Sequence, residues 1–294
     1  MSTTNTTPPQ GNEAPVTAPD IQSRKDGEKI CCMTAYDYSS GMIADAAGMD
    51  LVLVGDSLAM VVLGHEDTLS VTMDEMIHHV RATSRGVKRA LLVADMPFMS
   101  YSTVEMALEN GGRFLSEGRA KAVKLEGGEN VVPQIEALVA AGIPVMAHIG
   151  LTPQHVARFG GFKAQGKTLE AAKALVEDAR AVEAAGAFCV VLEAIPVEVA
   201  ELITKAVDIP TIGIGAGNVT DGQILVYHDV LGLFDRFTPK FVRTYVQHGK
   251  EAVQALEMYG KDVRSTRFPG DKNTFYLSDE MAEQVRKIKI KKKK

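Results

Sequence analysis

The sequence predicts an α/β fold, a (β/α)8 barrel, from three observations. Short apolar runs recur along the chain and have the character of strands buried on both faces of a sheet. A helix-like segment separates each run from the next, which is the alternation of a parallel sheet. Eight such units follow one another over about 250 residues, a length typical of a closed barrel.

The predicted strands are short apolar segments that alternate with amphipathic or alanine-rich segments. The clearest is Leu-Val-Leu-Val at 51–54, because this apolar run stops at Gly55. In chain order, the predicted strands are 29–34, 51–54, 90–94, 122–125, 144–147, 188–192, 211–214 and a weaker one at 230–233. The predicted helices are 39–47, 73–85, 103–117, 131–141, 169–185, 197–207 and 240–259. Gly48 and Gly186 directly follow two of these helices, where glycine commonly ends a helix.

An open doubly wound sheet is the main alternative to the barrel. It would carry a glycine-rich fingerprint after the first strand, and the residues Thr34 to Asp37 contain none. No linker separates the units, so we expect one barrel domain over residues 25–277. Residues 1–24 are rich in Thr, Pro, Asn and Gly and are expected to be disordered, and residues 278–294 form a basic C-terminal tail.

Composition indicates an intracellular, cytoplasmic protein that acts on small molecules. The three cysteines form no CxxC pair, no apolar run has membrane-spanning length, and the N-terminus lacks the apolar core of a signal peptide. The chain has a net charge of −5, although its last nine residues carry seven positive charges, so the other 285 residues have a net charge of −12. An acidic body argues against nucleic acid or a membrane as the main partner.

Polar residues follow nearly every predicted strand. In a barrel all strand C-termini open on one face, so these residues converge although they are distant in sequence. They are Thr34, Asp56 with Ser57, Asp95, Lys124 with Glu126, His148, Glu193 and the glycine-rich loop 215–218. Taken singly, an Asp after a strand is commonly a helix cap and a lone His a structural residue. Seven consecutive strands that end in this way favour an active site.

The residue types at these strand ends indicate metal-assisted chemistry on an anionic substrate. Asp56, Asp95 and Glu126 offer only oxygen ligands, which suit Mg²⁺ rather than Zn²⁺. Lys124 supplies a fixed cation beside them, and Glu193 is a candidate general base. Such a site suits a 2-oxo acid, because a metal ion bound to its oxygens acidifies the adjacent C–H and stabilises the enolate.

Several motifs resemble those of the ketopantoate hydroxymethyltransferase family. The matching segments lie on the predicted strands and in the same order, between about residues 30 and 269. They are TAYDY at 34–38, VGDSL at 54–58, ADMPF at 94–98, VKLEGG at 123–128, HIGLTPQ at 148–154 and IGIGAGNVTDGQILV at 212–226.

This resemblance implies a barrel of the phosphoenolpyruvate/pyruvate superfamily type and a role in pantothenate biosynthesis. The expected reaction transfers a hydroxymethyl group from 5,10-methylenetetrahydrofolate to 3-methyl-2-oxobutanoate, giving 2-dehydropantoate through a Mg²⁺-stabilised enolate. By position, Asp56, Asp95 and Glu126 match the family's metal ligands and Glu193 its proton acceptor. Its oxo-acid contacts are matched by Asp56, Ser57, Asp95 and Lys124. The family also implies a homo-oligomer, typically a decamer.

Other interpretations remain at this point. His148 is either a further polar contact to the substrate or a structural residue, and the 215–218 glycines serve close packing or, less plausibly, folate contact. Tyr36, residues 159–162 and Lys163 are candidates to line the folate site. The chain is alternatively another Mg²⁺-dependent 2-oxo-acid carbon–carbon lyase, although no cysteine lies in a suitable glycine-rich loop. A non-catalytic barrel used for binding or assembly is the alternative of another class.

Overall fold

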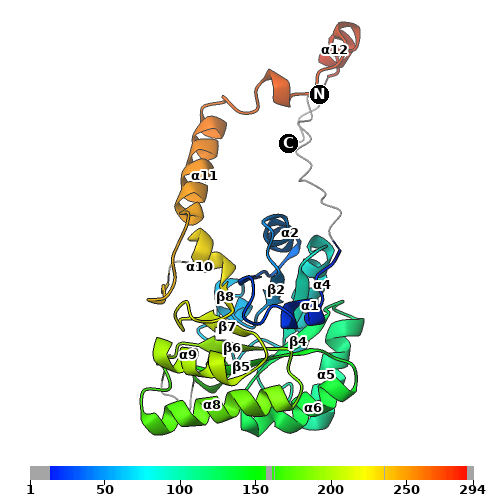
Figure 1. Ribbon diagram of the computed structural model, residues 1–294. Helices are drawn as coiled ribbons and strands as arrows, with labels where there is room; N and C mark the ends of the chain where they lie inside the picture. The colour runs from blue at the N-terminus through cyan, green and yellow to red at the C-terminus, as the bar shows by residue number, and fades with distance from the viewer. Residues whose placement is uncertain (1–13, 157–160, 162, 235, 290–294) are drawn as a thin grey trace. The chain divides into compact units, whose positions relative to one another are not determined.

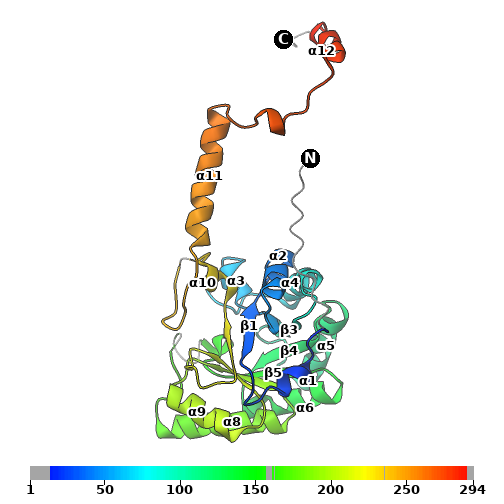
Figure 2. The same ribbon diagram turned by 45° about the horizontal axis from the view of Figure 1, so that its top comes forward.

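Eight parallel strands pair in chain order and close into a barrel, because the last strand pairs with the first (Figures 1 and 2). The structure is a computed structural model and describes all residues except 1–13, 157–160, 162, 235 and 290–294. The strands are β1 (Ile30–Thr34), β2 (Leu51–Val54), β3 (Leu91–Asp95), β4 (Ala122–Glu126), β5 (Val145–Gly150), β6 (Cys189–Glu193), β7 (Thr211–Ile214) and β8 (Gly222–Leu225). The closed barrel confirms the predicted fold class.

Helices lie outside the strands and bury apolar side chains against them (Figure 1). Those of the barrel unit are α1 (Ala18–Gln22), α2 (Tyr38–Ala46), α3 (Leu58–Val61), α4 (Met73–Gly86), α5 (Val104–Ser116), α6 (Val132–Ala140), α8 (Leu169–Ala184), α9 (Val197–Ala206) and α10 (Tyr227–Leu231). The longer helices begin at threonines, because Thr72, Thr103 and Thr168 each accept a hydrogen bond from a backbone N–H of the first turn. These caps fix where α4, α5 and α8 start.

The eighth strand differs from the prediction. The expected strand at 230–233 is wrong, since Tyr227–Leu231 is helix α10 and the strand is Gly222–Leu225. Gly222 and Gln223 hide the apolar signal of this strand. The glycine is required there, because a Cβ at Gly222 would lie 2.6 Å from the backbone oxygen of Ile30 on the neighbouring β1.

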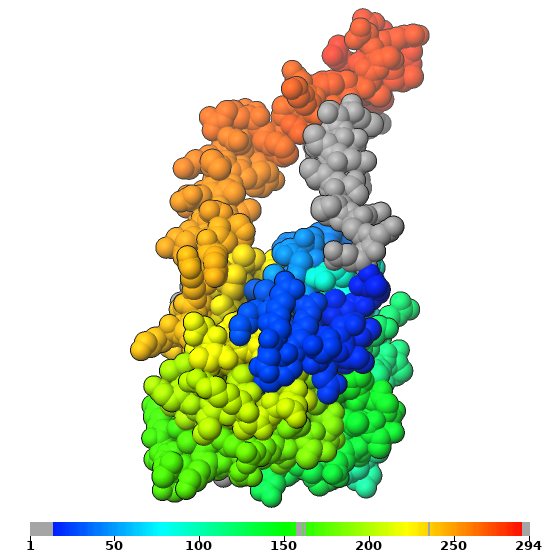
Figure 3. All heavy atoms as spheres, in the orientation of Figure 1, coloured from blue at the N-terminus to red at the C-terminus, as the bar shows by residue number. Residues whose placement is uncertain are grey.

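The segment before the barrel is ordered where the structure describes it. Residues 1–24 were expected to be disordered, but α1 packs into the apolar interior of the barrel, and Ile21 is fully buried there. Polar contacts anchor the segment that follows. Lys25 Nζ lies 3.0 Å from the Asp221 carboxylate, 196 residues further along the chain. Figure 3 shows these N-terminal residues, in blue, lying against the barrel unit.

The chain divides into two compact units, residues 1–245 and 246–294. The second unit holds α11 (His248–Arg264) and α12 (Asp279–Arg286), and none of its described residues is buried. The helix expected at 240–259 is α11, which begins at residue 248 and ends at residue 264. The strands and the cavity-lining residues described below lie in the first unit. In the part of the chain that is described, no helix is both long and apolar enough to cross a membrane.

Candidate active site

Strand alternation carries the polar side chains into the barrel. Successive side chains of a strand point to opposite faces. On β4, Ala122 faces the barrel interior while Val123 and Leu125 pack against the outer helices, so Lys124 and Glu126 also face inward. The same alternation, above an inner apolar layer, directs inward Asp95 at the end of β3, His148 on β5 and Glu193 at the end of β6. The predicted set thus forms the top layer of the barrel interior.

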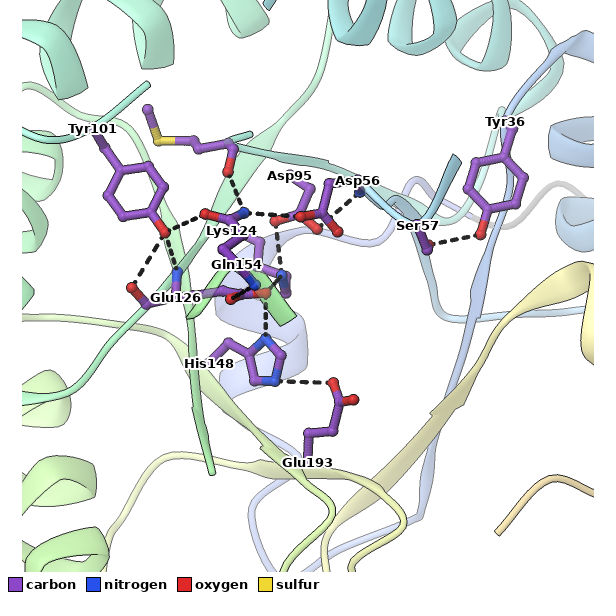
Figure 4. A network of polar contacts seen from close by, with 11 residues as sticks. Tyr36, Asp56, Ser57, Asp95, Tyr101, Lys124, Glu126, His148, Gln154 and Glu193 are labelled. Carbon is purple, nitrogen blue, oxygen red and sulfur yellow. Dashed lines mark hydrogen bonds and ion pairs between the residues drawn. The ribbon is translucent and has the colours of Figure 1, made fainter. Parts of the chain in front are cut away.

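Asp56 lies just beyond β2 and does not cap a helix. No side-chain hydrogen bond caps α3, which begins directly afterwards. The backbone N–H of Asp56 instead donates to Asp95 Oδ2 at 3.1 Å, which joins the ends of two neighbouring strands (Figure 4). Beside it, Ser57 Oγ lies 2.9 Å from the hydroxyl of Tyr36. The carboxylate of Asp56 is therefore available for another role.

Lys124 is the cation at the centre of the acidic cluster. Its Nζ donates to Asp95 Oδ1 at 2.7 Å and lies 3.6 Å from Glu126 Oε1. Burial alone opposes a charge on Lys124, but Asp95, Glu126 and Asp56 outweigh it and raise the pKa of the ammonium group. Lys124 is thus held as a permanent positive charge.

The three carboxyl groups have different proton affinities although all are buried. Burial, followed by repulsion from Asp95 and Glu126, raises the pKa of Asp56 well above its usual value. Burial also raises the pKa of Asp95, and Lys124 partly offsets this. Burial favours a neutral Glu126 as well, yet Lys124 and His148 lower its pKa. Three buried carboxyl groups thus share one lysine, and two of them bind a proton more tightly than they would in water.

His148 joins the acidic cluster to the candidate base. Its Nδ1 is 3.4 Å from Glu126 Oε1, and its Nε2 is 3.2 Å from Glu193 Oε2 (Figure 4). Burial and Lys124 oppose protonation of the ring, but these two carboxylates raise the pKa of His148 to about 9. The imidazole thus lies within ion-pair distance of both acids, beside the candidate base.

Gln154 and Tyr101 were not among the predicted site residues, although Gln154 ends one of the quoted motifs. The Gln154 amide donates to Asp56 Oδ2 at 2.9 Å, and its backbone N–H donates to Glu126 Oε2 at 3.0 Å. The Tyr101 hydroxyl donates to Gln154 Oε1 at 2.6 Å, which fixes which way the amide points. Tyr101 lies in a loop and Gln154 in the short 3-10 helix Pro153–His155, where no strand periodicity marks them.

The predicted site residues line one cavity of about 800 Å³ at the C-terminal end of the barrel. Asp56, Ser57, Asp95, Lys124, Glu126, His148 and Glu193 all contribute to its wall. Tyr36 and Lys163, candidates for folate contact, do not line it, and residues 159, 160 and 162 lie outside the described residues. Gly215 and Gly217 do line it, and both pack closely, with a Cβ on Gly215 only 2.6 Å from the Phe241 ring.

The donor set suits a hard divalent cation. Glu126 Oε1 is buried without a hydrogen bond from any described residue, and the nearby acceptors are carboxylate oxygens, which Mg²⁺ prefers. Among the described residues, no three acidic, thiol or imidazole side chains already stand in the arrangement of a bound ion. Lys124 and Gln154 occupy oxygens of Asp95 and Asp56 instead, so a cation has to compete with these two partners.

Known proteins resemble this chain over most of its length. The pattern of the family described as ketopantoate hydroxymethyltransferase matches residues 15–271. The 3-methyl-2-oxobutanoate hydroxymethyltransferase of Oleidesulfovibrio alaskensis is 58% identical over 266 residues, covering 90% of this chain and 92% of the relative. That of Syntrophobacter fumaroxidans is 56% identical over 278 residues, covering 94% and 99%.

Solved structures of low sequence identity share the fold. Phosphonopyruvate hydrolase matches with a TM-score of 0.58 and 15% identity, over 92% of this chain and 97% of the other. An oxaloacetate acetylhydrolase in complex with oxalate matches with a TM-score of 0.57 and 14% identity, over 93% and 98%. At this level of identity the likeness is one of barrel architecture alone.

Proposed function

The chain belongs to the ketopantoate hydroxymethyltransferase family, and on that premise we propose how its cavity performs the reaction. The chain transfers a hydroxymethyl group from 5,10-methylenetetrahydrofolate to 3-methyl-2-oxobutanoate and so makes 2-dehydropantoate for pantothenate biosynthesis. The observation that carries this proposal is the single cavity in which Glu193 faces, across His148, a buried cluster of Asp56, Asp95 and Glu126 around Lys124.

Asp56, Asp95 and Glu126 are the residues proposed to hold Mg²⁺. When bound there, the ion supplies positive charge that stabilises negative charge on the oxygens of the oxo acid. Lys124 adds a fixed positive charge at the same place. Ser57, whose Oγ lies beside the Tyr36 hydroxyl, can donate a hydrogen bond to a substrate oxygen. The substrate carboxylate and keto group are thereby oriented toward β2, β3 and β4.

Glu193 is the proposed base. Its side chain retains 15% exposure on the cavity wall, whereas Glu126 is almost completely buried, so Glu193 is the one of this pair that can reach substrate. It accepts the proton from C3 of the oxo acid, and His148 holds its carboxylate in orientation. C3 then forms a bond to the transferred carbon, the two carbon–nitrogen bonds of the donor break, and water supplies the hydroxyl oxygen. The two nitrogens of the released tetrahydrofolate take up the proton removed from C3 and one proton from that water.

The competing lyase hypothesis finds no support in the cavity wall. It expects a catalytic cysteine, and no described residue that lines the cavity is a cysteine. Cys32 and Cys189 are buried, and burial raises the pKa of both thiols, which opposes formation of a thiolate nucleophile.

Exchange of the C3 proton of 3-methyl-2-oxobutanoate with deuterated water, measured without folate, tests the base. Glu193→Gln should slow Mg²⁺-dependent exchange by about 100-fold or more, because an amide cannot accept the proton. Glu198→Gln, an exposed glutamate on α9, is the matched control. Exchange that is undiminished in Glu193→Gln would reject the assignment.

A second experiment tests the whole reaction. Purified protein is assayed for 2-dehydropantoate with both substrates and Mg²⁺, with and without EDTA, and Asp56→Ala should lose Mg²⁺-dependent turnover while keeping the circular dichroism spectrum of the wild type. No product under any condition would reject the proposed function, and a substantially active Asp56→Ala variant would reject the metal-ligand role.

We also propose that the protein is a homo-oligomer. The second unit exposes apolar side chains, among them Val253, Leu256 and Met258 of α11. Another copy of the chain is the proposed cover. Light scattering should give an oligomer for the wild type and a smaller species for Val253→Asp/Leu256→Asp, and a monomeric wild type would reject the proposal.

A further inference from the structure

The proposed chemistry uses only part of the cavity. Its volume of about 800 Å³ lies in the upper range for ligand sites, which span ~300–1,000 Å³, and an oxo acid of a few carbons fills a small fraction of it. The charged residues come from β2 to β6. The wall contributed by β8 and the segment after it is mainly apolar, with Leu225, Phe234, Phe237 and Phe241 among its residues.

One carboxylate lies in this apolar wall. Asp229, in α10, lines the cavity and is only 8% exposed, yet no described residue donates a hydrogen bond to its side chain. Buried carboxylates are ordinarily paired, as Asp221 is with Lys25. Burial raises the pKa of Asp229 to about 6. A buried acid without a partner, facing a cavity, indicates a ligand that supplies the missing donors.

Backbone contacts hold Asp229 in this position. The N–H of Tyr227 donates to Thr34 Oγ1 at 2.9 Å, which ties the start of α10 to the end of β1. Thr244 Oγ1 donates to the backbone oxygen of Asp229 at 3.0 Å. In the closed strand order, β8 stands opposite β4, which carries Lys124 and Glu126. Asp229 therefore approaches the cavity from the side of β8 and β1, opposite the strand that carries Lys124 and Glu126.

We propose that Asp229 binds the pyrimidine edge of the folate pterin, accepting parallel hydrogen bonds from its N3–H and 2-amino groups. This inference rests on the proposed function, which supplies the folate. Two adjacent donors match a carboxylate in the way that an Arg side chain does. The phenylalanine side chains of the same wall offer apolar surface to a flat ring. Lys167 and Lys240, also on the cavity wall, suit the glutamyl carboxylates of the folate tail.

The test compares wild type and Asp229→Asn in two measurements. Tetrahydrofolate binding by calorimetry should weaken on the order of 10- to 100-fold in the variant, because Asn replaces an acceptor with a donor that opposes the ligand's own donors. An analogue in which a methyl group replaces the 2-amino group should bind the wild type more weakly by a similar factor, and Asp229→Asn should discriminate little between the two ligands. Glu198→Gln should bind both ligands as the wild type does.

The folate-independent exchange of the oxo-acid C3 proton separates this proposal from the proposed function. We expect Asp229→Asn to retain exchange while its KM for methylenetetrahydrofolate rises. Loss of exchange in the variant alone would overturn the assignment, as would unchanged tetrahydrofolate affinity. Absence of exchange in the wild type would instead reject the proposed function, and the calorimetric comparison would still decide whether Asp229 binds the pterin.

Discussion

Gln154 Nε2 lies 2.9 Å from Asp56 Oδ2, and the two residues are 98 positions apart in the chain. The same amide group donates to the backbone oxygen of Met96 and accepts from Tyr101, so all of its polar atoms are paired in the interior. Gln154 is therefore a positioning residue: its hydrogen bond holds the buried carboxyl group of Asp56, and substitution of Gln154 should change the orientation and the pKa of that group.

Gln154→Leu should lower kcat/KM on the order of 10- to 100-fold, because a hydrogen bond to a charged group is lost. The bond from Gln154 lowers the pKa of Asp56, so its removal should also move the acidic limb of the pH–rate profile to higher pH. The full profile of kcat/KM from pH 5 to 9 is the measurement. Gln134→Leu, which removes an amide that contacts only the backbone of Tyr101, should leave that limb in place. An unmoved limb in Gln154→Leu would show that Gln154 serves packing alone.

His148 should stabilise the fold in a pH-dependent manner. Its pKa of about 9 in the folded chain exceeds the ordinary value of about 6.5, so the folded state binds the proton more tightly. The stabilisation is complete below about pH 6.5 and disappears as the pH rises through 9. Urea unfolding with EDTA should therefore show His148→Gln a few kcal/mol less stable than the wild type at pH 6, with the difference shrinking by pH 9.5. A difference that stays constant with pH would contradict the protonated state.

In contrast to His148, Asp229 should lower the free energy of unfolding. Its pKa is raised to about 6 in the folded chain, so the unfolded chain ionises first and stability falls as the pH rises from about 4 to 6. Asp229→Asn should raise the free energy of unfolding by about 2 kcal/mol at pH 8, and the gain should vanish toward pH 4. Thermal unfolding at the two pH values measures it. Such a gain is typical of a residue kept for function, and a destabilised variant at pH 8 would contradict it.

Adjacent glycines in α5 provide a matched pair. A Cβ on Gly112 meets no atom within 4 Å, whereas one on Gly111 would lie 2.6 Å from Leu138 Cδ2. Gly112→Ala should stabilise the protein by about 1 kcal/mol, because alanine favours the helix interior. Gly111→Ala should destabilise it by roughly 1–3 kcal/mol through overpacking against α6. The denaturant midpoints of the two variants, each compared with that of the wild type, measure these effects. Equal shifts in the two variants would contradict the predicted difference between Gly111 and Gly112.

The layer of polar side chains at the strand ends could be predicted because it obeys local rules. Asp95, Lys124 and Glu126 occupy ends of short apolar strands, where alternation and barrel topology together place them on one face. Gln154 and Tyr101 obey no such rule. Their roles arise from contacts between segments outside the strands, such as the hydrogen bond between these two residues, which are 53 positions apart.

The errors at the edges of the barrel have related causes. Strand β8 begins with Gly222 and Gln223 and lacks the apolar run that marks the other strands, and at Gly222 close packing against β1 excludes a side chain. Helix α1 offers only Ala18 and Ile21 to the interior, too few apolar residues to stand out in a polar N-terminal segment. Asp229 was missed because an acid in a short helix after a weak strand has no distinguishing neighbours in the sequence.

The pairing of β1 with β8 closes the barrel, and it can form only late in the synthesis of the chain. Lys25 cannot meet Asp221 until the 196 residues that follow it have been synthesised. At ~5–20 residues per second, this takes roughly 10 to 40 s on a ribosome. Throughout that interval β1 has an open edge and α1 has no complete barrel to fill. The nascent chain thus presents unpaired backbone groups to other chains, and slower synthesis lengthens the time for which this edge is exposed to aggregation.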